Sequence, residues 1–202
     1  MSEMKEYFDS LKGLSVAVIG MGVSNTPLIR MLLREGLKVT VCDRSPREKL
    51  AEQAAELESL GAKFIETKDK DVLSLDEYTV EAYKGNHTIS VCHFIIKDKE
   101  KCLFYALDGA WLQYEEIRAV WKNKPDLAVF DATVGFVEKD WRVFEHNNLN
   151  MVIEMKKSID RDIKKYVISH MAYTLHTDHD TLSAEMEKHG IVTAYDGLEL
   201  EF

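Results

Sequence analysis

The amino-acid sequence predicts an α/β protein built from two successive units, on three observations. Up to about residue 65, short apolar runs alternate with amphipathic runs in the order β-α-β-α-β, as in the first half of a Rossmann-like sheet. A charged stretch, ETKDKDVLSLD, covers residues 66–76. Beyond it, a longer series of strands and helices alternates to the end of the chain. We therefore expect one unit at residues 1–68 and a second at residues 69–202.

The elements of the first unit follow from residue type. Residues 15–19 (SVAVI) form a β-branched apolar run, as expected of a buried parallel strand. A helix is expected over 28–35, with Thr26 as its N-cap, Pro27 at its first position and Gly36 just beyond its end. The remaining elements are a strand at 38–42, a long helix at 46–60 and a short strand at 62–65.

In the second unit, alternation of apolar and polar residues indicates strands, and apolar residues three and four apart indicate helices. The expected strands are 78–83, 91–96, 102–106, 127–130, 166–169, 191–195 and 198–202. The expected helices are 114–122, 148–159 and 180–189.

Composition restricts the partners and the compartment of the protein. The net charge of −9 over 202 residues argues against a general nucleic-acid binder, which needs a basic face to displace counterions. Three cysteines without zinc-type spacing suit a reducing compartment. No stretch has the length and apolar character of a signal peptide or a membrane span. We expect a cytoplasmic protein with no membrane partner.

A glycine-rich turn follows the first strand and is a candidate phosphate site. Gly20 and Gly22 would let the backbone approach an anion, and the N–H groups of the next helix would point at it. Asp43 lies 23 residues after Gly20 (43 minus 20), near the usual offset of an acidic residue that holds a sugar. Asn25 stands at the third glycine position of the dinucleotide fingerprint, so no NAD is expected. The residues alone leave nucleotide binding and a purely structural turn equally open.

The stretches EYFDSLKG, VAVIGMGVSNTPLIRMLL, LKVTVCDR and LGAKFI make residues 1–65 similar to a known domain. They resemble the N-terminal uridine-nucleotide domain of the UDP-N-acetylmuramoyl-alanine:D-glutamate ligases. The resemblance implies diphosphate contacts from the turn and uracil contacts after the second strand: Gly20, Gly22, Ser24, Asn25 and Thr26, then Asp43 and Arg44. It does not imply ligation, since no GxxxxGK[ST] sequence occurs in the chain.

Polar residues of the second unit fall where its strands are expected to end. These are Asn86-His87-Thr88, Asp108-Gly109, Asp131-Ala132-Thr133 and His170. Side chains just past strand ends gather at one edge of an α/β sheet, where sites form. Two histidines and one or two aspartates at such an edge suit a divalent transition metal.

Residues from about 72 onward resemble the C-terminal half of metallo-β-lactamase-fold hydrolases, nearest the branch of phosphodiesterases and transfer-RNA 3′-processing nucleases. The matching stretches are YTVEAYKGNHT, CLFYALDGAW, DLAVFDATVG, EHNNLNMVIEM, KYVISHMAYTLH and VTAYDGLELEF. The resemblance implies that His87 binds one metal ion, that Asp108 bridges two and that His170 binds the second. It implies that His146 is the general acid, that Asp131 shapes a loop, and that the metal is zinc or manganese. The implied fold is a Rossmann-like unit followed by half of a metallo-β-lactamase αββα sandwich.

The first motif of that family, HxHxDH, is absent, and the first histidine of the chain is His87. Three ligands shared between two ions are too few, because a catalytic zinc normally has three protein ligands of its own. We therefore expect an incomplete site with weak or no hydrolysis. Three hypotheses stand: a metal-dependent phosphodiester hydrolase, a uridine-nucleotide-binding module, and a chimeric or truncated protein without catalysis. A small phosphorylated or nucleotide ligand would suit the first two.

The other histidines are expected to be structural. His93 lies inside an apolar strand, and His176, His179 and His189 flank a helix. The second unit would supply only one of the two sheets of its fold, leaving an apolar face uncovered. We therefore expect the first unit to pack against that face or the protein to form a homodimer.

Overall fold

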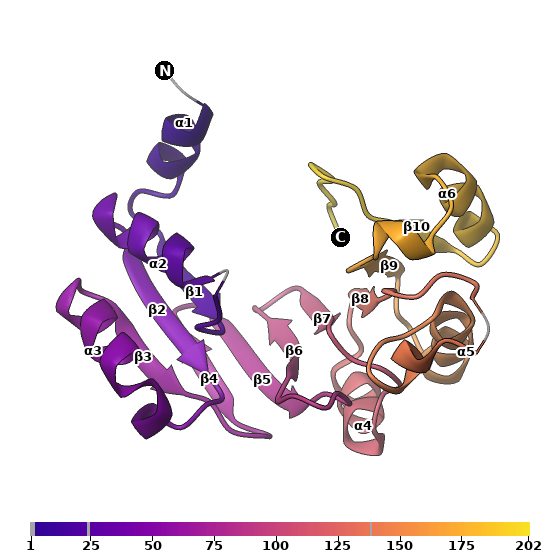
Figure 1. Cartoon of the computed structure of the whole chain (residues 1–202), viewed down its shortest axis with the longest axis horizontal. Helices are drawn as coiled ribbons and strands as arrows, with labels where there is room; N and C mark the ends of the chain where they lie inside the picture. Colours follow the sequence, from indigo (N-terminus) through magenta and orange to yellow (C-terminus); the bar gives the residue numbers. More distant parts are fainter. Residues whose placement is uncertain (1–2, 24, 138) are drawn as a thin grey trace. The chain divides into compact units, whose positions relative to one another are not determined.

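The computed structural model describes residues 3–23, 25–137 and 139–202. The chain divides into two compact units, Met1–Lys68 and Asp69–Phe202. Both units are α/β, as the sequence predicts (Figure 1).

The first unit is a three-stranded parallel sheet with helices between its strands. In chain order it contains α1 (Glu3–Ser10), β1 (Ser15–Ile19), α2 (Asn25–Arg34), β2 (Lys38–Asp43), the 3-10 turn η1 (Arg47–Leu50), α3 (Ala51–Ser59) and β3 (Lys63–Glu66). The strand order is β1-β2-β3, and both pairs are parallel. Ile29, Val41 and Ala54 are fully buried in its core. The βαβαβ prediction is confirmed, although the long helix expected over 46–60 is split into η1 and α3.

Thr26 is not the N-cap of α2, so that prediction is wrong. The helix begins at Asn25, and the Thr26 hydroxyl donates to the carbonyl oxygens of Met21 and Gly22, each at 3.1 Å. The predicted end of the helix is confirmed. Gly36 has φ +79°, and its N–H and that of Leu37 bond back to Leu33 and Leu32 in a Schellman arrangement.

The second unit is a mixed seven-stranded sheet in the order β10-β9-β8-β7-β6-β5-β4. Its strands are β4 (Val72–Leu75), β5 (Tyr78–Lys84), β6 (Cys92–Lys97), β7 (Cys102–Ala106), β8 (Leu127–Asp131), β9 (Lys165–Ser169) and β10 (Ile191–Thr193). Strands β4 to β7 pair antiparallel and β7 to β10 pair parallel. The helical elements are α4 (Tyr114–Asn123), η2 (Trp141–Phe144), α5 (Leu149–Ile159), η3 (Tyr173–Leu175) and α6 (His179–Glu187). Residues of α4, α5 and α6 pack with Phe104, Phe130 and Ile168 in one buried cluster.

In the second unit one strand was not predicted, and one predicted strand is wrong. Strand β4 lies within the segment 66–76, where charged neighbours hide the short alternation of VLSL. Residues 198–202 form no strand, because the chain turns at Asp196-Gly197, where the Leu198 N–H bonds to the Tyr195 carbonyl. The Lys165 ammonium then donates to the Glu201 carbonyl at 2.8 Å.

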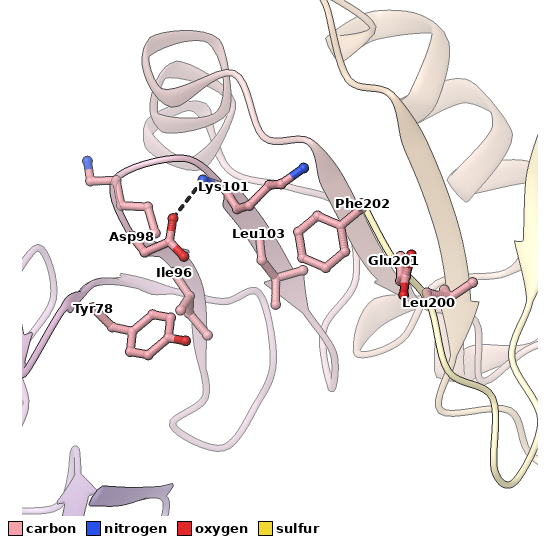
Figure 2. A pocket seen from close by; sticks show the side chains of 9 residues that line it. Tyr78, Ile96, Asp98, Lys101, Leu103, Leu200, Glu201 and Phe202 are labelled. Atoms are coloured by element: carbon pink, nitrogen blue, oxygen red, sulfur yellow. Dashed lines mark hydrogen bonds between the residues drawn. The ribbon is translucent and has the colours of Figure 1, made fainter. Parts of the chain in front are cut away.

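The C-terminal tail reaches the sheet face opposite the helices. Figure 2 shows Phe202 beside Leu103. Both residues line a cavity of about 390 Å³, together with Ile96 and Tyr78. The C-terminal residues of the second unit therefore contact part of the apolar sheet face that was expected to be exposed. Leu103 and Asp108 are five residues apart, so roughly 16 Å of extended chain separates this cavity from the far edge of the sheet.

None of the described helices is both long and apolar enough to cross a bilayer. No disulfide joins Cys42, Cys92 or Cys102. Burial raises the pKa of the Cys42 and Cys102 thiols to about 11, which leaves both thiols protonated and unreactive.

Candidate metal centre

The polar residues past the strand ends gather at one edge of the second sheet. Asp108 follows β7, Asp131 is the last residue of β8 and His170 follows β9. His87 follows β5, which runs in the same direction as β7 because both are antiparallel to β6. His146 precedes α5. The three predicted metal ligands His87, Asp108 and His170 therefore lie at the same edge of the sheet as Asp131, and the predicted general acid His146 lies within hydrogen-bond distance of Asp131.

Three imidazoles surround one oxygen of Asp108. Its Oδ1 lies 3.6 Å from His87 Nε2, 3.9 Å from His170 Nε2 and 3.9 Å from His146 Nδ1. Ligand atoms about 2.1 Å from a tetrahedral ion are roughly 3.4 Å from one another. The observed separations from Asp108 are somewhat wider. Among the described residues, Asp108, Asp131, His146 and His170 offer ligand atoms that all lie within 4.8 Å of one another, whereas His87 belongs to a separate group.

Asp131 is the hydrogen-bond centre of the site, and its side chain is fully buried. One carboxylate oxygen, Oδ2, lies 3.0 Å from His146 Nδ1 and 3.1 Å from His170 Nδ1, and it accepts the Asp108 N–H at 3.0 Å. The other oxygen accepts the N–H groups of Thr133 and Asn147. The carboxylate therefore fixes two rings and three backbone N–H groups at once.

The contact between Asp131 and His170 shifts the pKa of both groups. Burial alone would raise the pKa of Asp131, but hydrogen bonds from His170, from the Thr133 N–H and from His146 hold it below its usual value. The hydrogen bond to Asp131 in turn raises the pKa of His170, against the opposing effect of burial. Protonated His170 has no lone pair for a cation, so acid should weaken metal binding.

The tautomers that these contacts favour suit His170 and His146 as functional groups. If each ring donates its Nδ1–H to Asp131, its Nε2 carries a lone pair at the open edge of the site. His87 differs, because its Nδ1 accepts the Ile89 N–H at 3.1 Å. In the neutral ring, Nε2 then carries the proton, so metal binding through it requires His87 to release that backbone contact.

The Thr133 hydroxyl links the two rings that Asp131 holds. It lies 2.8 Å from His170 Nδ1 and 3.2 Å from His146 Nδ1, and it can donate to the His170 carbonyl at 2.9 Å. Sequence patterns contain no signal for this role, because a threonine after a strand is common. Glu145 is a further residue that the sequence did not single out; it lies with His87 and His146 in a second group able to surround an ion.

Asp108 and His170 both adopt left-handed backbone, with φ of +60° and +58°. Such a conformation is unfavourable for residues other than glycine, and where it persists it is often associated with a functional site. Here the Asp108 N–H is held by Asp131 and the His170 carbonyl by Thr133.

The other histidines occupy structural positions. His93 is buried against Glu116, and His176 donates from Nε2 to the Ala132 carbonyl at 2.8 Å. His179 is exposed on α6, where it bonds Ser183, and the His189 backbone ends that helix.

The glycine turn of the first unit is closed by its own side chains. Asp43 accepts the Met21 N–H at 2.6 Å and the Ser45 N–H at 2.7 Å. The Asn25 amide donates to the carbonyls of Ile19 and Gly20, and Thr26 is buried. Arg44 follows β2. Ser24 lies outside the described residues.

Comparisons with known proteins give two separate likenesses, while no protein-family model matches the chain. Over 64 residues, or 32% of this chain, it is 44% identical to the UDP-N-acetylmuramoylalanine--D-glutamate ligase of Clostridium botulinum strain Hall. Over 49 residues it is 53% identical to the ligase of the same name from Symbiobacterium thermophilum. These matches span only 14% and 11% of the two ligases.

Solved structures resemble a much larger part of the fold. The metallo-β-lactamase fold protein YhfI from Bacillus subtilis matches 98% of this chain and 83% of its own, with a TM-score of 0.75 and 15% identity. A diphosphatase from the PhnP family matches all of this chain and 77% of its own, with a TM-score of 0.71 and 14% identity. Zinc-bound PqqB from Methylobacterium extorquens matches 92% of this chain and 71% of its own, with a TM-score of 0.68 and 16% identity. The structural neighbours are thus metallo-β-lactamase-fold proteins, and at these identities the likeness establishes the fold alone.

The left-handed backbone at His170 predicts an unusual order of variant stabilities. Both His170→Gly and His170→Ala remove the ring, but only glycine relieves the backbone, so His170→Gly should be the more stable by about 1 kcal/mol. At Ser169, in the extended strand β9, the order should reverse. Urea unfolding of the four variants measures both differences. A His170→Gly protein less stable than His170→Ala would mean that the turn is not held as described.

Proposed function

We propose that the second unit is the C-terminal half of a metal-dependent phosphodiester hydrolase, and that it holds one divalent cation and turns over weakly or not at all by itself. The observation that carries this proposal is the cluster of Asp108, Asp131, His146 and His170, whose ligand atoms lie within 4.8 Å of one another, with His87 Nε2 3.6 Å from Asp108 Oδ1. The phosphodiester class is supported by the stretches shared with the phosphodiesterase branch and by a PhnP-family diphosphatase among the structural neighbours.

The residues present fit a single cation better than two. Asp108 Oδ1 and His170 Nε2 have the chemistry of a carboxylate and an oriented imidazole, and His87 would join them after giving up the Ile89 N–H. Nitrogen and oxygen ligands of this kind accept zinc or manganese. A cation bound there would lower the pKa of a water molecule and polarise a phosphoryl oxygen.

His146 is the proposed proton donor. Asp131 fixes its ring through Nδ1, so a proton carried on Nε2 would be available for transfer to the leaving oxygen. After that transfer, the neutral ring keeps its Nδ1–H bond to Asp131, so it stays in place to be protonated again. This is the part of the chemistry that the chain's own residues supply.

Low turnover follows from what the sequence leaves out. The HxHxDH motif would bring further imidazoles and a carboxylate, and no such motif occurs in the chain. Asp131 adds a second negative charge beside Asp108, but its oxygens are already taken by five N–H or ring groups. Water therefore competes effectively for the cation, and a second ion lacks the ligands to clamp the opposite side of a phosphate.

Metal content and turnover test this proposal together. The purified chain should take up about one zinc or manganese ion at pH 8 and lose it on dialysis, with His170→Ala reducing uptake at least tenfold. Hydrolysis of bis-p-nitrophenyl phosphate should stay near the background rate. His189→Ala, a histidine outside the site, serves as the matched control. Robust turnover that both His87→Ala and His170→Ala abolish would contradict the low-activity proposal, and no metal uptake at all would contradict the cation site.

A second candidate function is uridine-nucleotide binding by the first unit. It is supported by the 44% identity to the D-glutamate ligase and by a turn whose Gly22 has open space where a Cβ would stand. Gly20, Gly22, Ser24, Asn25 and Thr26 would meet the diphosphate, and Asp43 and Arg44 the uracil. Both Asp43 carboxylate oxygens already accept a backbone N–H, from Met21 and from Ser45. Asp43 would therefore bind the uracil only through its remaining lone pairs.

Gly22→Val separates a ligand effect from a folding effect. No described atom lies within 4 Å of the Cβ position at Gly22, so the substitution should leave the unit folded while it blocks the approach of a phosphate. Calorimetry with UDP should give modest binding that Gly22→Val abolishes and that Val23→Ala, at an exposed neighbour, leaves unchanged. Absence of heat with UDP in the folded wild-type chain would leave the turn purely structural.

Three further expectations remain proposals. The composition and the three cysteines without disulfides support a cytoplasmic location. A homodimer is proposed through the sheet face opposite the helices of the second unit. The joining of a ligase-like and a hydrolase-like segment supports a chimeric origin of the chain.

A further inference from the structure

A buried pair, His93 and Glu116, lies beneath the loops that carry two of the proposed ligands. Each side chain is only 1% exposed, and His93 Nδ1 is hydrogen-bonded to Glu116 Oε1. The other Glu116 oxygen accepts the Gln113 N–H at 2.7 Å, which caps α4. The imidazole of β6 is thus tied through Nδ1 to the start of α4.

The free edge of the His93 ring lies against two glycines. A Cβ added at Gly109 would stand 2.5 Å from His93 Nε2, and one at Gly85 would stand 2.9 Å from it. Gly109 follows Asp108 directly, and Gly85 lies two residues before His87. Both ligand loops therefore rest on the same imidazole at a distance that only glycine permits.

The same two loops are also tied to each other and to Asp131. The Ala110 N–H bonds to the Asn86 carbonyl at 3.0 Å, and the Asn147 amide holds the Gly109 carbonyl at 3.0 Å. Asn147 in turn donates its N–H to Asp131. Any displacement of Gly109 is consequently passed to Asp108 on one side and to the Asp131 network on the other.

We infer that His93, held by Glu116, is a positioning residue that sets the separation of His87 and Asp108. This inference rests on the proposed cation site. The His93 Nε2 atom has no hydrogen-bond partner among the described residues, although it is buried. A phenylalanine in this position would fill the space without that cost, but it would leave the buried Glu116 carboxylate unpaired. The imidazole supplies both the volume beneath the loops and the bond to α4.

The test is a double-mutant cycle between Gly109 and His93, read through cobalt(II), whose visible spectrum reports ligand geometry. Gly109→Ala alone should weaken cobalt binding about tenfold or more and alter the spectrum, because the new methyl group meets a ring that Glu116 holds. In the His93→Ala background, Gly109→Ala should reduce cobalt affinity less than threefold, because the imidazole that the new methyl group would meet is absent. Met186→Ala, which empties a buried position in α6, is the control for lost stability and should leave the spectrum unchanged.

The outcomes distinguish this inference from the proposed function. Equal effects of Gly109→Ala with and without His93 would overturn the positioning role. If the wild-type chain takes up no cobalt, the cation site fails, and the positioning role is then read in the metal-free protein from the Asp108 amide and His87 ring signals in NMR spectra. Those signals should move in Gly109→Ala and return in the double variant. If these signals do not move in Gly109→Ala, the positioning role of His93 is refuted.

Discussion

The candidate centre depends on one buried carboxylate. Asp131 is fully buried, yet its pKa is held low because N–H groups and imidazoles from four segments of the chain converge on it. A buried charge without such partners would cost several kcal/mol. The need to satisfy it therefore fixes the rings of His146 and His170 and the backbone of Asp108 in one arrangement. The positions of the other side chains at this edge of the second sheet follow from that requirement.

The sheet explains why the carboxylate lies there. Parallel pairing of β7, β8 and β9 brings the ends of three strands to one edge, and Asp131 terminates the central strand of the three. Its neighbours Asp108 and His170 then reach it only by entering left-handed backbone. Hydrogen bonds with Asp131 and Thr133 hold these two residues in that conformation. Support from beneath comes from His93, which packs on Gly109.

Local patterns predicted the framework well and the contacts poorly. The run CLFYA coincides with β7, and the strands around it were found because apolar and polar residues alternate. Strand β4 was missed because charged residues surround it. His87, Asp108 and His170 were recognisable as polar residues past strand ends, and His146 only from a family resemblance. No sequence pattern could reveal that Asp131 takes both imidazoles, or that His93 lies under Gly109, since those contacts join residues far apart in the chain.

The most direct test of this account is the cation affinity of Asp131→Asn, a substitution that keeps the size of the side chain and removes its charge. An amide cannot accept from both rings and the backbone as the carboxylate does, so His146 and His170 should lose their fixed orientation. Isothermal titration with zinc at pH 8 should show affinity reduced about 10- to 100-fold relative to the wild-type chain. A wild-type affinity in a folded Asp131→Asn protein would contradict the central role of this carboxylate.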